Sequence, residues 1–146
     1  MKTIRLLPLL LLSLLVLPLC GADESTPKPA PHGEKPPVPK NVRNVGVEEF
    51  DKLRANRNHV VLDVRTPEEF AKGHIPGAIN LDYKAADFEK KVAELDKSKT
   101  YLVHCAGGVR SAKACVILDK SAFAHVVNLE PGFKAWENAG KPVEKK

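Results

Sequence analysis

One cysteine followed by small residues and an arginine gives this chain its clearest chemical signal. Residues 100–111 read TYLVHCAGGVRS, a hydrophobic run that leads directly into Cys105. The N–H groups of a short loop, the N-terminus of a helix and a guanidinium all favour a thiolate over a thiol, because each places positive potential near the sulfur. The pattern therefore predicts a reactive, nucleophilic cysteine.

The residues after this cysteine are the candidate binding loop. Glycines can turn their amide groups inward without side-chain clash, and a helix that begins near Val109 adds its dipole. We expect Arg110 to place a fixed charge beside a bound anion, and Ser111 either to donate to the sulfur or to cap the helix. The predicted site therefore has Cys105 and Arg110 as catalytic residues, and Ala106, Gly107, Gly108, Val109 and Ser111 as the binding loop.

Strands and helices alternate along the chain and position this loop. Hydrophobic patterning predicts strands over 42–45, 59–64, 78–81, 101–104 and 125–129, and helices over 47–56, from Thr66-Pro67, over 84–96 and 109–120, and after Pro131-Gly132. Regular alternation implies an α/β fold, with an open parallel sheet of about five strands and helices on both faces. Ligands bind at the carboxyl ends of the strands in such sheets, and Cys105 falls at one of these ends.

The first 22 residues are predicted to be a secretory signal peptide. Residues 6–19 are almost all Leu, Val and Pro, and Lys2 and Arg5 are the charged residues that precede them. Small residues before Asp23 favour cleavage after Ala22. Two alternatives remain, lipidation of Cys20 in a lipoprotein box and an uncleaved membrane anchor, and either would tether the chain to a membrane. Cleavage, lipidation and an uncleaved anchor all predict export to the periplasm or the cell envelope.

Residues 23–40 are predicted to be a stiff, solvated linker, because they hold six of the 12 prolines. The folded domain is then 41–146. Without Lys2 and Arg5 the formal net charge falls from +5 to +3, and this excess is spread along the chain. So mild a charge argues against a nucleic-acid-binding surface and is compatible with small anionic substrates.

Two stretches together resemble the rhodanese homology domain. They are residues 61–80, VLDVRTPEEFAKGHIPGAIN, and residues 104–112, HCAGGVRSA, followed by Ala135-Trp136 and residues 139–143. The resemblance covers residues 41–143 and implies a rhodanese-like fold and a sulfurtransferase activity. Cys105 would take a sulfane sulfur, carry it as a persulfide and yield it to an acceptor, with Asp63 and Arg65 supporting the loop. Neither a metal nor an organic cofactor is needed for this chemistry.

The resemblance also suggests partners and leaves alternative functions open. The donor would be a small anion such as thiosulfate or a persulfide, and the acceptor a thiol or cyanide. A single small domain with this core is expected to be a monomer. One alternative is a weakly active or inactive rhodanese domain that acts as a docking module in the envelope. Another is a cysteine phosphatase or arsenate reductase. Phosphatases of this fold have five residues between cysteine and arginine, whereas four separate Cys105 from Arg110.

Several other residues have structural interpretations. Arg65 could form an ion pair or a cap with Glu68 or Glu69 in place of supporting the loop. Cys115 is expected to be a buried helical residue, the alternative being a thiol that captures the persulfide. The remaining expectations are that His104 bonds nearby backbone, that His74 is structural, that Trp136 anchors the core and that Pro131, where many relatives have glycine, reshapes one wall of the pocket.

Overall fold

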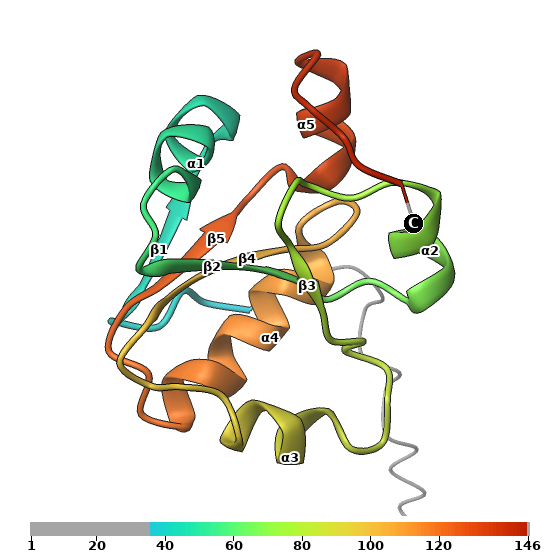
Figure 1. The fold of residues 1–146 in the computed structure, drawn as a ribbon. Coiled ribbons are helices and arrows are strands. Elements are labelled where there is room, and N and C mark those ends of the chain that lie inside the picture. The colour runs from blue at the N-terminus through green and yellow to red at the C-terminus, as the bar shows by residue number, and fades with distance from the viewer. Residues whose placement is uncertain (1–35, 146) are drawn as a thin grey trace, which may run out of the picture. The chain divides into compact units, whose positions relative to one another are not determined.

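The computed structural model describes residues 36–145, and Figure 1 shows a sheet flanked by helices. The elements are β1 (Val42–Val45), α1 (Val47–Arg54), β2 (His59–Asp63), α2 (Pro67–Lys72), β3 (Ile79–Asn80), α3 (Phe88–Ala93), β4 (Thr100–His104), α4 (Val109–Lys120), β5 (Val126–Leu129) and α5 (Gly132–Asn138). The predicted signal peptide, Cys20 and the linker up to residue 35 lie outside the described residues. Within 36–145, no helix is long and apolar enough to cross a bilayer.

The five strands form one sheet in the order β1-β5-β4-β2-β3, and every neighbouring pair is parallel. β4 is central: Asp63 of β2 lies opposite His104 of β4, and Val103 lies opposite Asn128 of β5. This arrangement confirms the predicted α/β fold with a parallel sheet of five strands and helices on both faces.

Alternate residues of the buried strands pack into two cores, one on each face of the sheet. One core joins Leu62 and Val103 to residues of α3 and α4, such as Val92 and Leu118. The other core holds Val61, Leu102 and Val127 together with α1 and α5, represented by Phe50 and Trp136. Figure 1 shows α3 and α4 on one side of the sheet and α1 and α5 on the other. Such two-sided burial explains why these strands read as continuous hydrophobic runs.

Local signals account for most element boundaries. α2 begins as predicted, because Thr66 and Glu69 form a reciprocal capping box with Pro67 at the first helical position. The helix expected over 84–96 is shorter, since α3 occupies only Phe88–Ala93. The flanking residues form turns, in which the Phe88 N–H donates to the carbonyl of Ala85 and the Leu95 N–H donates to that of Val92.

The strand order places Cys105 at a switch point of the topology. Along the strand order, the chain passes from β2 outwards to β3 in one direction, whereas it passes from β4 to β5 in the opposite direction. The connections after β2 and β4 therefore diverge and leave a crevice at the carboxyl ends of these two neighbouring strands. Asp63 ends β2 and Cys105 follows β4, so the fold brings the two sequence motifs together at this crevice.

Truncation of Trp136 tests the α1–α5 core. The Trp136 side chain is fully buried, meets the Phe50 ring edge-on with centroids 6.2 Å apart, and donates its indole N–H to the carbonyl of Pro142 at 2.8 Å. We expect Trp136→Ala to lower the free energy of unfolding by about 3–5 kcal/mol, measured by urea denaturation. Glu137→Ala, at an exposed position of the same helix, should change it by less than about 0.5 kcal/mol. Equal effects would contradict the role of Trp136 as a core anchor.

Candidate active site

Cys105 lies immediately after the central strand, at the start of the predicted loop. Only 1% of the residue is exposed, and its sulfur accepts a hydrogen bond from the backbone N–H of Gly108 at 3.2 Å. Because β4 is buried along most of its length, the strand fixes the position of this sulfur. The predicted nucleophile therefore already has one backbone donor directed at it.

Gly108 makes this contact possible through its backbone conformation. Its φ of 91° and ψ of −19° lie in the left-handed region, which residues with a Cβ rarely occupy. The turn directs the Gly108 N–H to the sulfur, and α4 begins at the next residue, Val109, as predicted. The Ser111 hydroxyl donates to the carbonyl of Gly108 at 3.1 Å, so it braces the loop backbone and makes no bond to the sulfur.

The beginning of α5 holds the other half of the loop. The N–H of Phe133 donates to the carbonyl of Cys105 at 2.7 Å, and that of Lys134 to the carbonyl of Ala106 at 3.1 Å. Gly132 permits this approach, because a Cβ there would lie 2.6 Å from the Ala106 oxygen. Sequence reasoning used Pro131-Gly132 only as the break before the last helix and missed that Gly132 lies against the loop. The Pro-Gly pair before a helix was the available signal.

A buried ion pair at the end of β2 contacts the start of α5, the helix that holds the loop. Asp63 and Arg65 are 0% and 4% exposed, and the guanidinium donates to both carboxylate oxygens, at 2.6 Å for the shortest bond. Arg65 also donates to the carbonyl of Gly73 at 2.7 Å and lies 4.0 Å from the centroid of the Phe133 ring. The supporting role predicted for both residues fits this geometry. The alternative partners of Arg65, Glu68 and Glu69, make no such bond.

Arg110 has a partner that the sequence analysis did not anticipate. Its two terminal nitrogens donate to the two oxygens of Glu69, at 2.7 and 2.8 Å, in a bidentate pair. This contact lowers the pKa of Glu69 from 4.5 to about 2 and raises the pKa of Arg110. The charge expected beside a bound anion is therefore shared with a carboxylate. The sequence indicated Glu69 only as an alternative partner of Arg65, and the separation of 41 residues between Glu69 and Arg110 hid their pairing.

Residues 46–139 match the model of the family described as rhodanese-like domain. The chain belongs to this family. The matched segment begins just before α1 and ends just after α5, so it contains the Cys105 loop, the Asp63–Arg65 pair and the Glu69–Arg110 pair. The resemblance stated from two sequence stretches is confirmed.

Individual relatives agree with the family match. A putative sulfurtransferase of Bacillus subtilis, YtwF, is 39% identical over 92 residues, which cover 63% of this chain and 86% of that protein. Thiosulfate sulfurtransferase 16, chloroplastic, from Arabidopsis thaliana is 38% identical over 96 residues, covering 59% and 80%. The crystal structure of a rhodanese-related protein from Thermoplasma volcanium superposes with a TM-score of 0.65 at 31% identity, covering 71% of this chain and 99% of that one.

In this rhodanese-like domain His104 is a buried, neutral side chain. Neither ring nitrogen makes a well-formed hydrogen bond, and the expected contact with nearby backbone is reduced to a weak influence of the Cys105 backbone on the ring. The ring lies between Phe50 and Phe133, and its Nε2 is 3.7 Å from an oxygen of Asp63. Burial lowers the pKa of His104 from 6.5 to about 4, and the nearby Asp63 charge opposes this change only in part. His74 does bond backbone, because its Nδ1 lies 3.0 Å from the carbonyl of Phe70.

The neutral state of His104 makes stability depend on pH. In the unfolded chain the imidazole takes up a proton near pH 6.5, but in the folded protein only near pH 4. Stability is therefore lost as the pH falls from 6.5 towards 4, by about 2–3 kcal/mol between pH 7 and pH 4.5. Urea denaturation at these two pH values should show the loss in the wild type. In His104→Leu the free energy of unfolding should fall by about 2–3 kcal/mol less than in the wild type. Identical losses in the two proteins would contradict a buried, neutral His104.

Cys115 lies on α4 in the core that also contains Cys105. It is fully buried and, like Cys105, is a free thiol. Burial first, and the Cys105 charge second, raise the pKa of the Cys115 thiol far above its usual range. A thiol that stays protonated is a poor nucleophile, so the structural interpretation of Cys115 is favoured over a resolving role.

A cavity of about 190 Å³, which we call the mouth, opens beside Ala106 of the loop, and Cys105 is not among the residues that line it. Ala106 of the loop and Phe133 contribute to its wall. Its charged lining residues are Arg65, Glu69, Lys72, Lys134 and Glu137, and the first two belong to the ion pairs described above. Lys72 and Lys134 therefore give this mouth a positive rim, with Glu137 as a single opposing charge.

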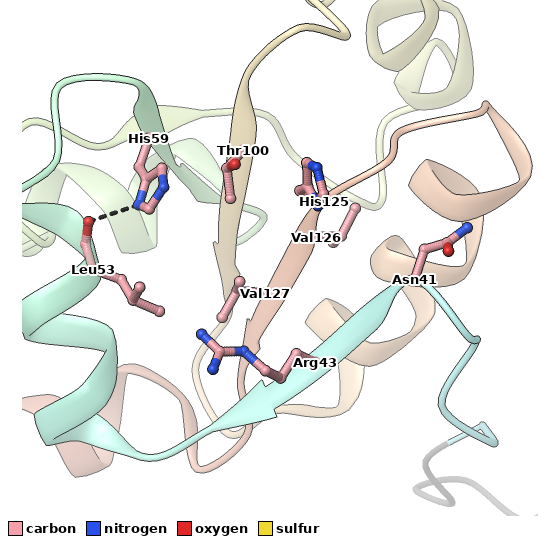
Figure 2. A pocket seen from close by; sticks show the side chains of 8 residues that line it. All are labelled: Asn41, Arg43, Leu53, His59, Thr100, His125, Val126 and Val127. Atoms are coloured by element: carbon pink, nitrogen blue, oxygen red, sulfur yellow. Dashed lines mark hydrogen bonds between the residues drawn. The ribbon is translucent and has the colours of Figure 1, made fainter.

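A larger pocket, of about 300 Å³, lies at the opposite edge of the sheet. Figure 2 shows His59, Thr100, His125 and Arg43 around it, at or near the starts of four strands. In a parallel sheet all strands begin at the same end, and Cys105 lies at the other end, where the strands finish. This larger pocket is therefore separate from the candidate site. No cluster of three or more His, Cys, Asp or Glu residues within 36–145 could hold a metal ion.

Substitution of Gly132 tests how α5 holds the loop. In Gly132→Ala the new methyl would overlap the Ala106 carbonyl, and φ at Gly132 is +73°, so the loop must shift. We expect the free energy of unfolding to fall by about 1–3 kcal/mol and alkylation of Cys105 by iodoacetamide to change severalfold. Gly107→Ala is the matched control for stability, because nothing lies within 4 Å of a Cβ there. If both variants unfold alike, the contact with α5 does not constrain the loop.

Proposed function

We propose that this member of a sulfurtransferase family moves a sulfane sulfur from a small anionic donor, such as thiosulfate, to a nucleophilic acceptor. Cys105 carries the sulfur as a persulfide between the two half-reactions. The observation that supports this most directly is the buried sulfur of Cys105 with the Gly108 N–H bonded to it at the start of α4. The name of the Arabidopsis thiosulfate sulfurtransferase supports thiosulfate as the first donor to test.

The two half-reactions balance without a cofactor. The Cys105 thiolate attacks the outer sulfur of thiosulfate; a sulfur–sulfur bond forms, and sulfite leaves with the electron pair of the bond that breaks. The acceptor, a thiolate or cyanide, then attacks the outer sulfur of the persulfide and regenerates the Cys105 thiolate. The Gly108 N–H and the positive end of α4 stabilise the anionic sulfur in each state.

The geometry of the mouth supports a small donor. Because only 1% of Cys105 is exposed, a reagent must reach the sulfur through a narrow opening. Lys72 and Lys134 at the rim attract anions towards the cavity beside Ala106. A large protein donor would need a more exposed sulfur, so thiosulfate and small persulfides fit this opening better.

The arrangement of Arg110 argues against the phosphatase alternative. Phosphate is commonly bound by an arginine that offers two parallel N–H groups. In this protein the two terminal nitrogens of Arg110 already bind Glu69. Four residues also separate Cys105 from Arg110, one fewer than in the phosphatases of this fold. The sulfurtransferase therefore remains the better-supported activity.

We also propose that the protein is exported and acts in the periplasm or the cell envelope as a monomer. The hydrophobic segment 6–19 behind Lys2 and Arg5 supports export. Expression of the complete sequence followed by intact mass measurement tests this, because cleavage after Ala22 gives a chain that begins at Asp23. A lipid mass on Cys20 would instead identify a lipoprotein, and the unprocessed mass would contradict cleavage.

The persulfide cycle is tested by intact mass spectrometry. Incubation with thiosulfate should add the mass of one sulfur atom, and cyanide should then remove it and yield thiocyanate. Cys105→Ser should gain no sulfur, whereas Cys115→Ser, at the buried second thiol, should still cycle. Absence of added sulfur with both thiosulfate and a glutathione persulfide would contradict the proposed activity and favour the docking module.

A further inference from the structure

Glu69 occupies both terminal nitrogens of the arginine that was expected to face the substrate. The Glu69–Arg110 bonds are 2.7 and 2.8 Å long, and the side chains are 34% and 21% exposed. Bidentate pairs of this kind combine fixed geometry with strong attraction. Arg110 is therefore held in one place and offers much less positive charge to a neighbouring anion than a free guanidinium would.

Glu69 is itself held in position by its own helix. Its Oε2 accepts from the N–H of Thr66 at 3.1 Å, and its backbone N–H donates to the Thr66 hydroxyl at 3.3 Å. This capping box fixes the carboxylate at the start of α2, so it is presented to Arg110 by a rigid element. The lowered pKa keeps Glu69 ionised at every physiological pH.

The other basic side chains buried near the loop also contribute little net charge, whereas Lys72 and Lys134 lie at the rim of the cavity. Arg65 is paired with Asp63 in a buried ion pair, and His104 is neutral above about pH 4. Both arginines near the loop are thus matched by carboxylates. Backbone dipoles are then the main source of positive potential at the Cys105 sulfur, with Gly108 as the donor in contact.

We propose that Glu69 is a positioning residue that fixes Arg110 beside the loop and cancels most of its charge, so that it sets how strongly the site attracts anions. The consequence for turnover rests on the proposed function. Thiosulfate, sulfite and thiocyanate are all anions, and a site with a full arginine charge would bind the donor tightly but would also retain the products. Binding that is equally strong for substrate and product slows release. Glu69 therefore lowers the affinity for the donor and speeds the release of the products.

The first test measures the potential at the sulfur without requiring sulfur transfer. Iodoacetate is anionic and iodoacetamide is neutral, so the ratio of their alkylation rates at one pH reports the potential, since the thiolate fraction cancels. The rates are measured on the full-length chain by following the peptide that contains Cys105. We expect Glu69→Gln to raise the iodoacetate-to-iodoacetamide ratio about threefold or more at low salt, and high salt to suppress the increase.

Glu68→Gln is the matched control, because Glu68 is the neighbouring acid in the same helical turn and makes no bond to Arg110. Its alkylation ratio should equal that of the wild type. Arg110→Gln should lower the ratio, since it leaves the Glu69 charge unpaired. The double variant, Glu69→Gln with Arg110→Gln, should return the ratio to near the wild-type value. Two uncharged side chains then replace an ion pair whose charges cancel, so the net charge beside the loop is the same.

Steady-state kinetics with thiosulfate and cyanide supply the second test. Glu69→Gln should lower both KM for thiosulfate and kcat, whereas a purely structural defect would lower kcat with KM unchanged or raised. An unchanged or reduced alkylation ratio in Glu69→Gln would overturn the proposal, as would a double variant far below the wild type. The alkylation result holds even if no sulfur is transferred, so failure of the proposed function is distinguishable from failure of this inference.

Discussion

The buried ion pair of Asp63 and Arg65 is the interaction on which the active-site end of the fold depends. Removing two charges from water is costly, and a pair at 0% and 4% exposure is tolerated only with close geometry and further hydrogen bonds. The protein supplies both, because the guanidinium also bonds the carbonyl of Gly73 and stacks on Phe133. The end of β2, the end of α2 and the start of α5 are thereby joined, and α5 in turn holds the carbonyls of the Cys105 loop.

This arrangement separates the reactive atom from the residues that control it. The sulfur is bonded by one backbone N–H, and the neighbouring charged side chains act mainly on one another. Backbone donors cannot swing away or titrate, so the environment of the sulfur is set by the fold. The charged side chains of Lys72 and Lys134 lie at the rim of the cavity, and of these two residues only Lys134 also holds the loop, through its backbone N–H.

Much of the fold could be predicted because its signals are local. The β-branched run of β2, the capping box of α2 and the small residues after Cys105 each specify one element without reference to the rest of the chain. The helix expected over 84–96 was overestimated, since apolar spacing continues through turns that periodicity cannot detect. The resemblance to a family then identified the rhodanese-like fold among α/β folds with a parallel sheet.

The contacts within the site were harder to predict, because they join distant segments. The pairing of Glu69 with Arg110, and the approach of Gly132 to Ala106, depend on how α2 and α5 pack around the loop. His104 shows a different difficulty. A histidine beside a candidate nucleophilic cysteine suggests a hydrogen-bonded role, yet the ring is packed between two aromatic side chains and neither nitrogen makes a well-formed hydrogen bond. Burial decided its state, and a sequence does not show burial at a single position.

The buried state of Cys115 has a consequence for oxidative damage. A cysteine oxidised to a sulfenic acid can be protected by forming a disulfide with a nearby thiolate, which prevents irreversible oxidation. Within residues 36–145 the one other cysteine is Cys115, whose thiol stays protonated inside the core. Within these residues, Cys115 is therefore a poor thiol for the recovery of an oxidised Cys105, and a thiol supplied from solution is favoured.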